Sequence, residues 1–354
     1  MLSPLYLLAL VASLGDFSVE RLRPYADLRL RMLDRHESGF ADRAGLLRAR
    51  LGIEPEFSEK FLLGLEISAG SGLSDQGRIE NAFENKGLGL SQAHLGMQSR
   101  GLTLHLGKFT SYLPTSSLLF DENLRPEGFE QAYEFQVANF DYRFSAAQWV
   151  LDSTTASSLE GISQDQSWLF AGAFEGKWKF DPESTLALLL LYEHIQSKTA
   201  ETANLSATRG NSFSGSPPTN SNLLEDFHVF EVGASLQGQP LGIPAQLVGS
   251  FAINLESKEQ DRGFWAKGRL GQAWHASEIL GELSYFYLEP DLQLALLSRQ
   301  DFGFTNRQGG RLEISYFPES FFRLGASYLY AQRIAKSVAQ SHRHELQIDL
   351  EARF

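Results

Sequence analysis

The sequence has no cysteine in its 354 residues, so neither disulfide bonds nor thiolate metal sites are available to it. Long apolar runs are also missing. The longest internal one is Leu186–Tyr192, far short of the roughly 20 residues that a transmembrane helix needs. The mean hydropathy of -0.21 is likewise too polar for a helical membrane protein. Acidic residues outnumber basic ones, and the net charge of -12 argues against general nucleic-acid binding.

The residues that are present indicate a folded chain rich in strands. Hydrophobic residues make up 43% of the sequence, charged residues 21% and aromatic residues 12%. This balance excludes a disordered chain, and few stretches have the periodicity of a helix. The length allows either two ordinary domains or one large barrel.

An apolar block at the start, residues 2–15, resembles the hydrophobic region of a secretory signal peptide. Ser13 and Gly15 are small residues of the kind found before a cleavage site, although the usual basic residues are missing. A buried strand or helix is the alternative interpretation. We expect residues 1–15 to be an export signal and residues 16–354 to form a single domain.

The last stretch, Ser341–Phe354, alternates between apolar and polar residues without interruption. A period of two places these sets on opposite faces of a β-strand. Soluble sandwiches and transmembrane barrels both contain such strands, with opposite faces buried. The chain ends on an aromatic residue at an apolar-face position, which resembles the signal read by the assembly machinery of bacterial outer-membrane barrels. We therefore interpret Phe354 as an assembly signal.

The same alternation recurs along the whole chain. The expected strands are Tyr25–Leu33, Leu46–Glu54, Phe61–Ala69, Leu90–Gln98, Leu102–Lys108, Glu130–Ala138, Phe140–Leu151, Trp168–Phe180, Thr185–Ile195, Phe227–Gln237, Ala245–Leu255, Phe264–Trp274, Glu278–Leu288, Arg311–Phe317, Phe322–Tyr330 and the terminal stretch. The connections between them are long and short in turn, which puts every short link of a meander at one end. This pattern predicts an all-β fold, a transmembrane antiparallel β-barrel of about 16 strands with short periplasmic turns and long extracellular loops.

Aromatic residues mark the expected membrane interfaces. Trp168 and Trp178 share one face of a strand, ten residues apart. At about 3.3 Å per residue and a tilt near 40°, they are roughly 25 Å apart along the membrane normal, which is the height of the apolar band between two aromatic girdles. Trp274 and Tyr328, near the ends of other strands, are expected at the same interfaces. The general preference of aromatic residues for strands explains their number but not this spacing.

Four arginines share the polar face of the first two strands by parity: Arg29, Arg31, Arg48 and Arg50. Burying these cations in a dry core costs several kcal/mol each, whereas a water-filled lumen removes that cost. We expect them to form a basic ladder on one wall of the lumen. The alternative is the solvated face of a soluble sheet.

A family resemblance becomes specific in the run QAHLGMQSRGLTLHLGKFTSYLPTSSLLFDENLRPEG, residues Gln92–Gly128. It joins a strand to a Gly-Lys pair that ends at Lys108 and then to the segment DENLRPEG that begins at Asp121. Together with the arginine-rich opening strands and the late loop QDFGFTNRQGG, this run resembles the bacterial putative-porin family over most of the chain. The resemblance implies an outer-membrane channel for small hydrophilic solutes, and we expect no cofactor, metal or catalytic residue.

In the sixteen-stranded porins that the chain resembles, the third loop folds inward and narrows the pore. The corresponding candidate is the segment 109–129, whose acidic groups opposite the arginine ladder would set a transverse field that selects ions and orients solutes. The charged residues expected at this constriction are Lys108, Asp121, Glu122, Glu127 and Glu130. The resemblance also implies contact with outer-membrane lipid, lipopolysaccharide and the barrel assembly machinery. By analogy alone it implies a homotrimer.

Two other classes of function remain open. A barrel enzyme, such as an outer-membrane phospholipase or protease, would need Ser, His and an orienting Asn, but no such spacing stands out around His94 and His105. An adhesin or structural barrel would use the Ser/Asn-rich segment Ser197–Asn222 as its working surface. Hydrolysis of lipid or peptide favours the enzyme, conductance without hydrolysis favours the channel, and adhesion that depends on the segment favours the adhesin.

Overall fold

The computed structural model describes residues 21–37, 40–58, 61–69, 77–78, 88–114, 117–121, 124–153, 166–196, 200–216, 220–335 and 342–354. The expected export signal, residues 1–15, and Glu122 lie outside these ranges. Within them, no helix is long and apolar enough to cross a membrane.

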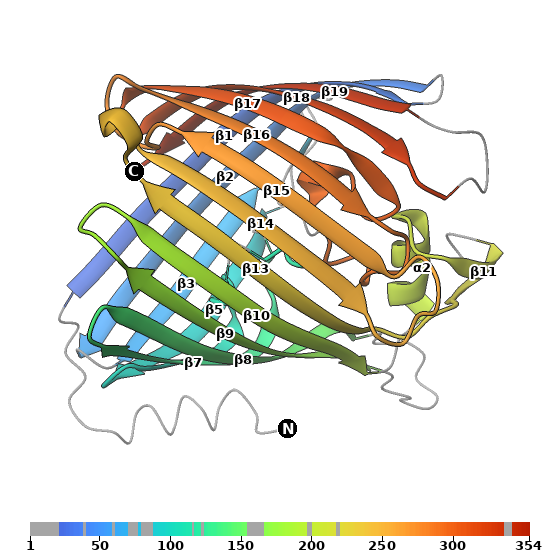
Figure 1. Ribbon diagram of the computed structural model, residues 1–354, viewed down its shortest axis with the longest axis horizontal. Helices are drawn as coiled ribbons and strands as arrows, with labels where there is room; N and C mark the ends of the chain where they lie inside the picture. Colours follow the sequence, from blue (N-terminus) through green and yellow to red (C-terminus); the bar gives the residue numbers. More distant parts are fainter. Residues whose placement is uncertain are drawn as a thin grey trace.

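Sixteen antiparallel strands form a closed barrel (Figure 1). They are β1 (Arg21–Glu37), β2 (Phe40–Ser58), β3 (Phe61–Ala69), β5 (Leu88–Ser99), β6 (Leu102–Lys108), β7 (Glu127–Val137), β8 (Phe140–Ser153), β9 (Gln166–Lys179), β10 (Thr185–Gln196), β13 (His228–Gly238), β14 (Ala245–Asn254), β15 (Arg262–Leu270), β16 (Glu278–Leu288), β17 (Arg307–Glu319), β18 (Phe322–Arg333) and β19 (His342–Arg353). The two-residue strand β4 (Gly77–Arg78) also pairs with β2. Each expected strand coincides with one wall strand, so the predicted fold class is confirmed.

The first and last strands close the barrel. β1 pairs with β19 in antiparallel register, with Leu30 opposite Leu350. The C-terminal residue continues this pairing, because the Phe354 N–H donates to the Ala26 carbonyl at 2.9 Å and the Phe354 carbonyl accepts from the Ala26 N–H at 3.0 Å. Closure leaves no sheet edge whose backbone groups would need water.

The connections differ sharply between the two ends of the barrel. Short turns gather at the end where the C-terminus lies, here called the short-turn end (Figure 1). The opposite, long-loop end carries α2 (Ala200–Thr208) and the separate hairpin of β11 (Phe213–Ser216) and β12 (Asn220–Leu223). The links follow the expected alternation in most of the chain. Two places depart from it: β2 begins at Phe40 soon after β1 ends at Glu37, where a long link is due, and the links 255–261 and 271–277 on either side of β15 are equally long.

The strands expose their apolar side chains and bury their charged ones. On β19 the outward Leu346, Ile348 and Leu350 are exposed, whereas the inward Glu345 and Glu351 are almost completely buried. A soluble sandwich has the reverse arrangement. An exposed apolar face around a polar interior is the pattern of a transmembrane barrel.

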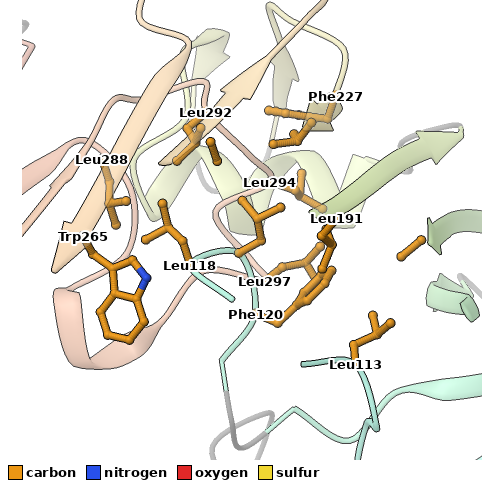
Figure 2. Close-up of a cluster of buried hydrophobic side chains, with 14 of the residues drawn as sticks. Leu113, Leu118, Phe120, Leu191, Phe227, Trp265, Leu288, Leu292, Leu294 and Leu297 are labelled. Atoms are coloured by element: carbon orange, nitrogen blue, oxygen red, sulfur yellow. The ribbon is translucent and has the colours of Figure 1, made fainter. Parts of the chain in front are cut away.

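An apolar core nevertheless fills part of the interior (Figure 2). It joins the inward side chains of β8 to β10 and of β13 to β16 to two segments that fold into the barrel. These segments are the first inner loop, residues 109–126, and the second inner loop, residues 289–306. Buried side chains of the core include Leu118, Leu119 and Phe120 from the first loop, Leu292, Leu294 and Leu297 from the second, and Trp149, Leu169 and Leu191 from the wall. The open part of the interior is thereby confined to the remaining, charged wall.

Candidate functional site

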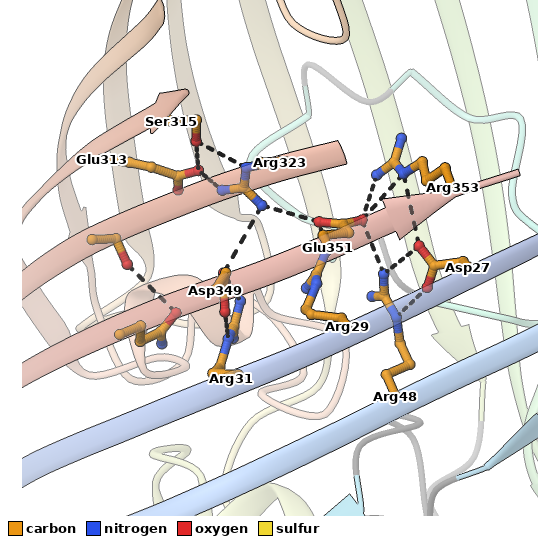
Figure 3. Close-up of polar contacts among 12 residues, drawn as sticks. Asp27, Arg29, Arg31, Arg48, Glu313, Ser315, Arg323, Asp349, Glu351 and Arg353 are labelled. Carbon is orange, nitrogen blue, oxygen red and sulfur yellow. Dashed lines mark hydrogen bonds and ion pairs between the residues drawn. The ribbon is translucent and has the colours of Figure 1, made fainter. Parts of the chain in front are cut away.

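The inner face of β18, β19 and β1 carries a continuous network of arginines and carboxylates (Figure 3). Its centre is Glu351 on β19. Arg29, directly opposite on β1, donates to it at 3.1 Å, and Arg48 of β2 donates at 3.3 Å. Arg323 of β18 donates at 3.0 Å and Arg353 of β19 at 2.9 Å. One carboxylate thus links arginines from neighbouring strands on both sides.

Two aspartates extend the network in opposite directions. Arg31 donates to both carboxylate oxygens of Asp349, at 2.7 and 2.9 Å. Arg48 does the same to Asp27, at 2.8 and 3.0 Å. This forked geometry is the one that guanidinium and carboxylate groups favour. The arginines of β1, β2, β18 and β19, here called the arginine wall, therefore have counter-charges on these same strands.

The four arginines expected in one ladder occupy different environments. Arg29 and Arg31 line the open cavity, whereas Arg48 is only 3% exposed and lies behind them. Arg50 instead approaches Glu66 of β3 at 4.0 Å. The ladder is thus divided between the cavity surface and the wall beneath it.

The first inner loop crosses the interior and is held on β13. Ser117 Oγ donates to Glu231 at 2.6 Å, and the Leu118 N–H donates to the same carboxylate at 2.7 Å. The start of the loop is held by Glu130 of β7, which accepts from the Tyr112 N–H at 3.0 Å. Glu130, expected at the constriction, is 1% exposed and positions the loop backbone.

The second inner loop joins the first loop to the charged wall. The Asp121 N–H donates to the Leu297 carbonyl at 3.1 Å, and Arg299 donates to the Ser117 carbonyl at 3.3 Å. The two loops therefore support each other. Asp121, one of the acidic residues expected at the constriction, lines the same cavity as Arg29.

Asp301 connects the second loop to the wall. It lies in the short helix η2 (Gln300–Phe302) and pairs with Arg311 of β17 at 2.5 Å. Desolvation inside the barrel would by itself raise the pKa of Asp301. The guanidinium groups of Arg311, Arg299 and Arg31 outweigh this effect and hold the pKa well below its usual range.

The remaining pair of expected constriction residues lies elsewhere. Lys108 and Glu127 form an ion pair of 3.5 Å where β6 and β7 meet the first loop. The Glu127 side chain is largely exposed. Neither residue lines the cavity of the arginine wall.

This cavity has a volume of about 370 Å³ and a charged lining. Ten cationic side chains and seven acidic ones contribute to it. They come from β1, from β15 to β19 and from both inner loops. The arrangement can hold water and coordinate charged groups of a solute, since guanidinium donors and carboxylate acceptors both line the space.

The aromatic residues expected at the membrane interfaces separate into two groups. Trp168, Trp178 and Tyr328 have outward parity on β9 and β18, and Trp178 stacks on Phe140 with ring centroids 6.0 Å apart. Trp274 departs from the expectation, because it lines the cavity. The Arg353 guanidinium lies 4.0 Å from its ring centroid.

Two further expected residues have clear positions. Phe354 is 71% exposed on the outer face and packs against Phe321, with ring centroids 5.7 Å apart. His94 and His105 are buried beside the start of the first loop, where His105 stacks on Tyr112 at 4.2 Å. In the described part of the chain, neither histidine Nδ1 has a hydrogen-bond partner.

Sequence reasoning missed the contribution of β17, β18 and the second loop. Arg311 and Glu313 of β17 are hydrogen-bonded at 2.9 Å, and Arg323 of β18 contacts Glu313 as well. The period of two did indicate part of this arrangement, because Arg311 and Glu313 are two residues apart and must share a face of the strand. Nothing in the sequence indicated that Asp301 would reach this face.

Comparisons with known proteins agree with this architecture. A family model described as "Putative porin" matches residues 38–220. The fold is similar to Pseudomonas putida OprB, with a TM-score of 0.61 and 12% identity over 94% of each chain. Salmonella typhi OmpF has a TM-score of 0.55 at 9% identity, over 94% of this chain and 97% of that one. The trimer form of Vibrio cholerae OmpT has a TM-score of 0.54 at 10% identity, over 94% and 99%. No curated protein matches the sequence.

At such low identities the solved structures show the fold alone, and that fold is the porin barrel. The family match shows in addition that the sequence is related to the family, because it covers more than half of the chain. Family and fold together place the barrel in the bacterial outer membrane. The chain belongs to the putative porin family.

Proposed function

We propose that this porin lets ions and small hydrophilic solutes diffuse passively, with weak selectivity, along the charged wall of its interior. The charged cavity between β1, β15 to β19 and the two inner loops is the observation that carries this proposal. In a dry interior each of these ions would cost several kcal/mol, and paired geometry offsets only part of that cost. A water-filled passage removes the cost.

The inner loops supply the constriction in this proposal. The apolar core closes one side of the barrel, so a solute must pass between the loops and the arginine wall. Arg29, Arg31 and Asp121 line this passage. Arg48 supports the passage from the wall. Glu130 and the ion pair Lys108–Glu127 support it at the ends of the first inner loop.

The remaining parts of the proposal concern export, assembly and partners. Residues 1–15 act as the export signal, and Phe354 is read by the barrel assembly machinery. Outer-membrane lipid and lipopolysaccharide surround the apolar outer face. A homotrimer is supported by the likeness to Vibrio cholerae OmpT in its trimer form.

Two rival functions lead to different observations. A barrel enzyme would place a serine and an orienting side chain within hydrogen-bonding distance of His94 or His105. Among the described residues, the Nδ1 atoms of these two histidines have no hydrogen-bond partner. An adhesin would work through the long-loop end, which includes α2 and the β11–β12 hairpin. The porin family and fold favour the channel over both.

Planar-bilayer recording of the purified protein tests the proposal. We expect stepwise ion conductance without hydrolysis of lipid or peptide. Deletion of residues 214–222 removes most of the β11–β12 hairpin at the long-loop end and keeps Asn211, whose side chain binds the second inner loop. This deletion should leave the conductance unchanged. A heat-stable barrel without conductance would overturn the channel, and in that case loss of cell adhesion on the same deletion would establish the adhesin.

A further inference from the structure

We infer that the pore prefers anions, because its charged wall presents guanidinium groups to the passage and keeps the matching carboxylates beneath them. The permeant class would be small solutes with carboxylate or phosphate groups. This inference rests on the proposed channel function. It concerns which member of each ion pair, the guanidinium or the carboxylate, is exposed to a solute. The number of charged residues alone does not show this.

Side-chain exposure within the ion pairs shows the layering. The Glu351 carboxylate is completely buried, whereas its partners Arg29 and Arg353 are 13% and 50% exposed. Glu345 is 4% exposed beneath Arg35 at 32%. The pair Arg31–Asp349 is nearly even, at 12% against 5%. A solute beside this wall therefore meets donors before acceptors.

Hydrogen-bonding capacity leads to the same conclusion. A carboxylate has about four lone-pair sites, and four arginines contact Glu351. Each guanidinium has five N–H donors in a rigid fork. Arg353 is the half-exposed member of this set and donates to Glu351 through Nε and Nη2. Its other N–H groups can therefore bind water or a passing anion.

The distribution of charge in the chain strengthens the inference. The whole chain has a net charge of -12, yet the cavity lining has ten cations and seven acidic groups. Positive charge is thus concentrated in the passage. The pairs around β17 have the opposite order. Asp301 is 33% exposed against 11% for Arg311. Glu313 is 17% exposed against 11% for Arg311 and 12% for Arg323. Arg299 lines the cavity close to the Asp301 carboxylate, and its field and that of Arg31 act on it. The field in such a low-dielectric channel raises the local concentration of counter-ions.

Reversal potentials across a KCl gradient test the preference. We expect the wild-type channel to be several-fold more permeable to chloride than to potassium. The decisive variant is R35Q/E345Q, which removes the clearly layered pair Arg35–Glu345 without changing the net charge. If the exposed guanidinium sets the preference, chloride selectivity should fall although net charge is constant.

The pair Arg269–Glu282 provides the matched control. These residues face each other on β15 and β16, and their side chains are about equally exposed, at 30% and 23%. R269Q/E282Q should therefore leave the selectivity unchanged. Equal effects of the two double variants, or potassium preference in the wild type, would overturn the inference while leaving the channel intact. Absence of any conductance would instead contradict the proposed function.

A measurement on the unmodified protein keeps the inference testable if a variant fails to fold. Inorganic pyrophosphate presents several anionic oxygens to the guanidinium forks. We expect it to block chloride current in a concentration-dependent way at micromolar to millimolar levels. Spermine at the same concentrations should have little effect. Block by spermine but not by pyrophosphate would overturn the inference.

Discussion

The first inner loop should be held in the barrel mainly by its apolar side chains, and removing two of them tests this. Leu118 and Leu119 are both completely buried in the interior core. Truncation of a buried leucine to alanine costs about 2–5 kcal/mol. The double variant L118A/L119A should therefore lose about 4–10 kcal/mol of the free energy that docks the loop.

The polar anchor of the same loop is weaker. Glu231 accepts hydrogen bonds from the Ser117 hydroxyl and the Leu118 N–H. Hydrogen bonds to a charged group contribute about 1.5–3 kcal/mol each. E231Q retains the shape of the side chain and one acceptor oxygen, so it should lose only about 2–3 kcal/mol. Comparison of these magnitudes predicts that the apolar contacts decide whether the loop stays docked.

Single-channel conductance and trypsin digestion read out the position of the loop. Release of the loop should give L118A/L119A a larger and noisier conductance and expose the bond after Arg125 to trypsin. E231Q should behave like the wild type. The control L188A/L190A makes the same change on the outer face of β10, where both leucines are exposed. Wild-type conductance and protease resistance in L118A/L119A would refute the reasoning about the core.

Three further changes have defined outcomes. G107A should lower the yield of folded barrel, because Gly107 has φ +122° and an added Cβ would lie 2.3 Å from the Ala93 carbonyl oxygen. G172A has open space around the added Cβ and should fold normally. Heat-modifiability on gels compares the two variants. Deletion of Phe354 removes two backbone hydrogen bonds to Ala26 and the contact with Phe321, so outer-membrane assembly should fall far more than unit conductance does in the channels that form. The lowered pKa of Asp301 means that its ion pair stabilises the fold above the ordinary aspartate pKa of about 4 and is lost only in stronger acid. The difference in melting temperature between wild type and D301N should therefore be constant from pH 7 to about pH 4 and should vanish below that range, and a difference that disappears between pH 7 and pH 5 would contradict the shift.

The barrel could be predicted from the sequence because each strand carries its own signal. Period-two alternation in stretches such as Leu346–Phe354 requires only local residues, and the short links identify one end of the meander. Boundaries agreed closely for β10, which is Thr185–Gln196 where Thr185–Ile195 was expected. They agreed less well for β1 and β2, which extend about four to six residues beyond the expected stretch at each end.

The interior was harder to predict, because it depends on which loops enter it. The run Leu186–Leu191 is apolar on both faces, which is the pattern of a strand buried on both sides. That signal indicated an apolar surface inside the barrel but not the inner loops that cover it. Trp274 was misplaced for a related reason. Its left-handed backbone, with φ +60°, lies in the turn between β15 and β16, and parity cannot be extended through such a turn.

The two halves of the interior explain how one barrel can be both well packed and permeable. The apolar core fixes the inner loops against β8 to β10 and β13 to β16, and the Asp301–Arg311 ion pair adds a link from the second loop to the charged wall. The wall in turn satisfies its carboxylates laterally, through pairs such as Arg29–Glu351 across β1 and β19. Because neither half uses up the outward donors of the arginines, these groups are left to face the passage. Selectivity in this porin should therefore depend on the layering within the wall more than on the acidic residues of the first inner loop. Neutralising Asp121 should consequently change the reversal potential less than R35Q/E345Q does. A larger effect of D121N would show that the first inner loop sets the selectivity.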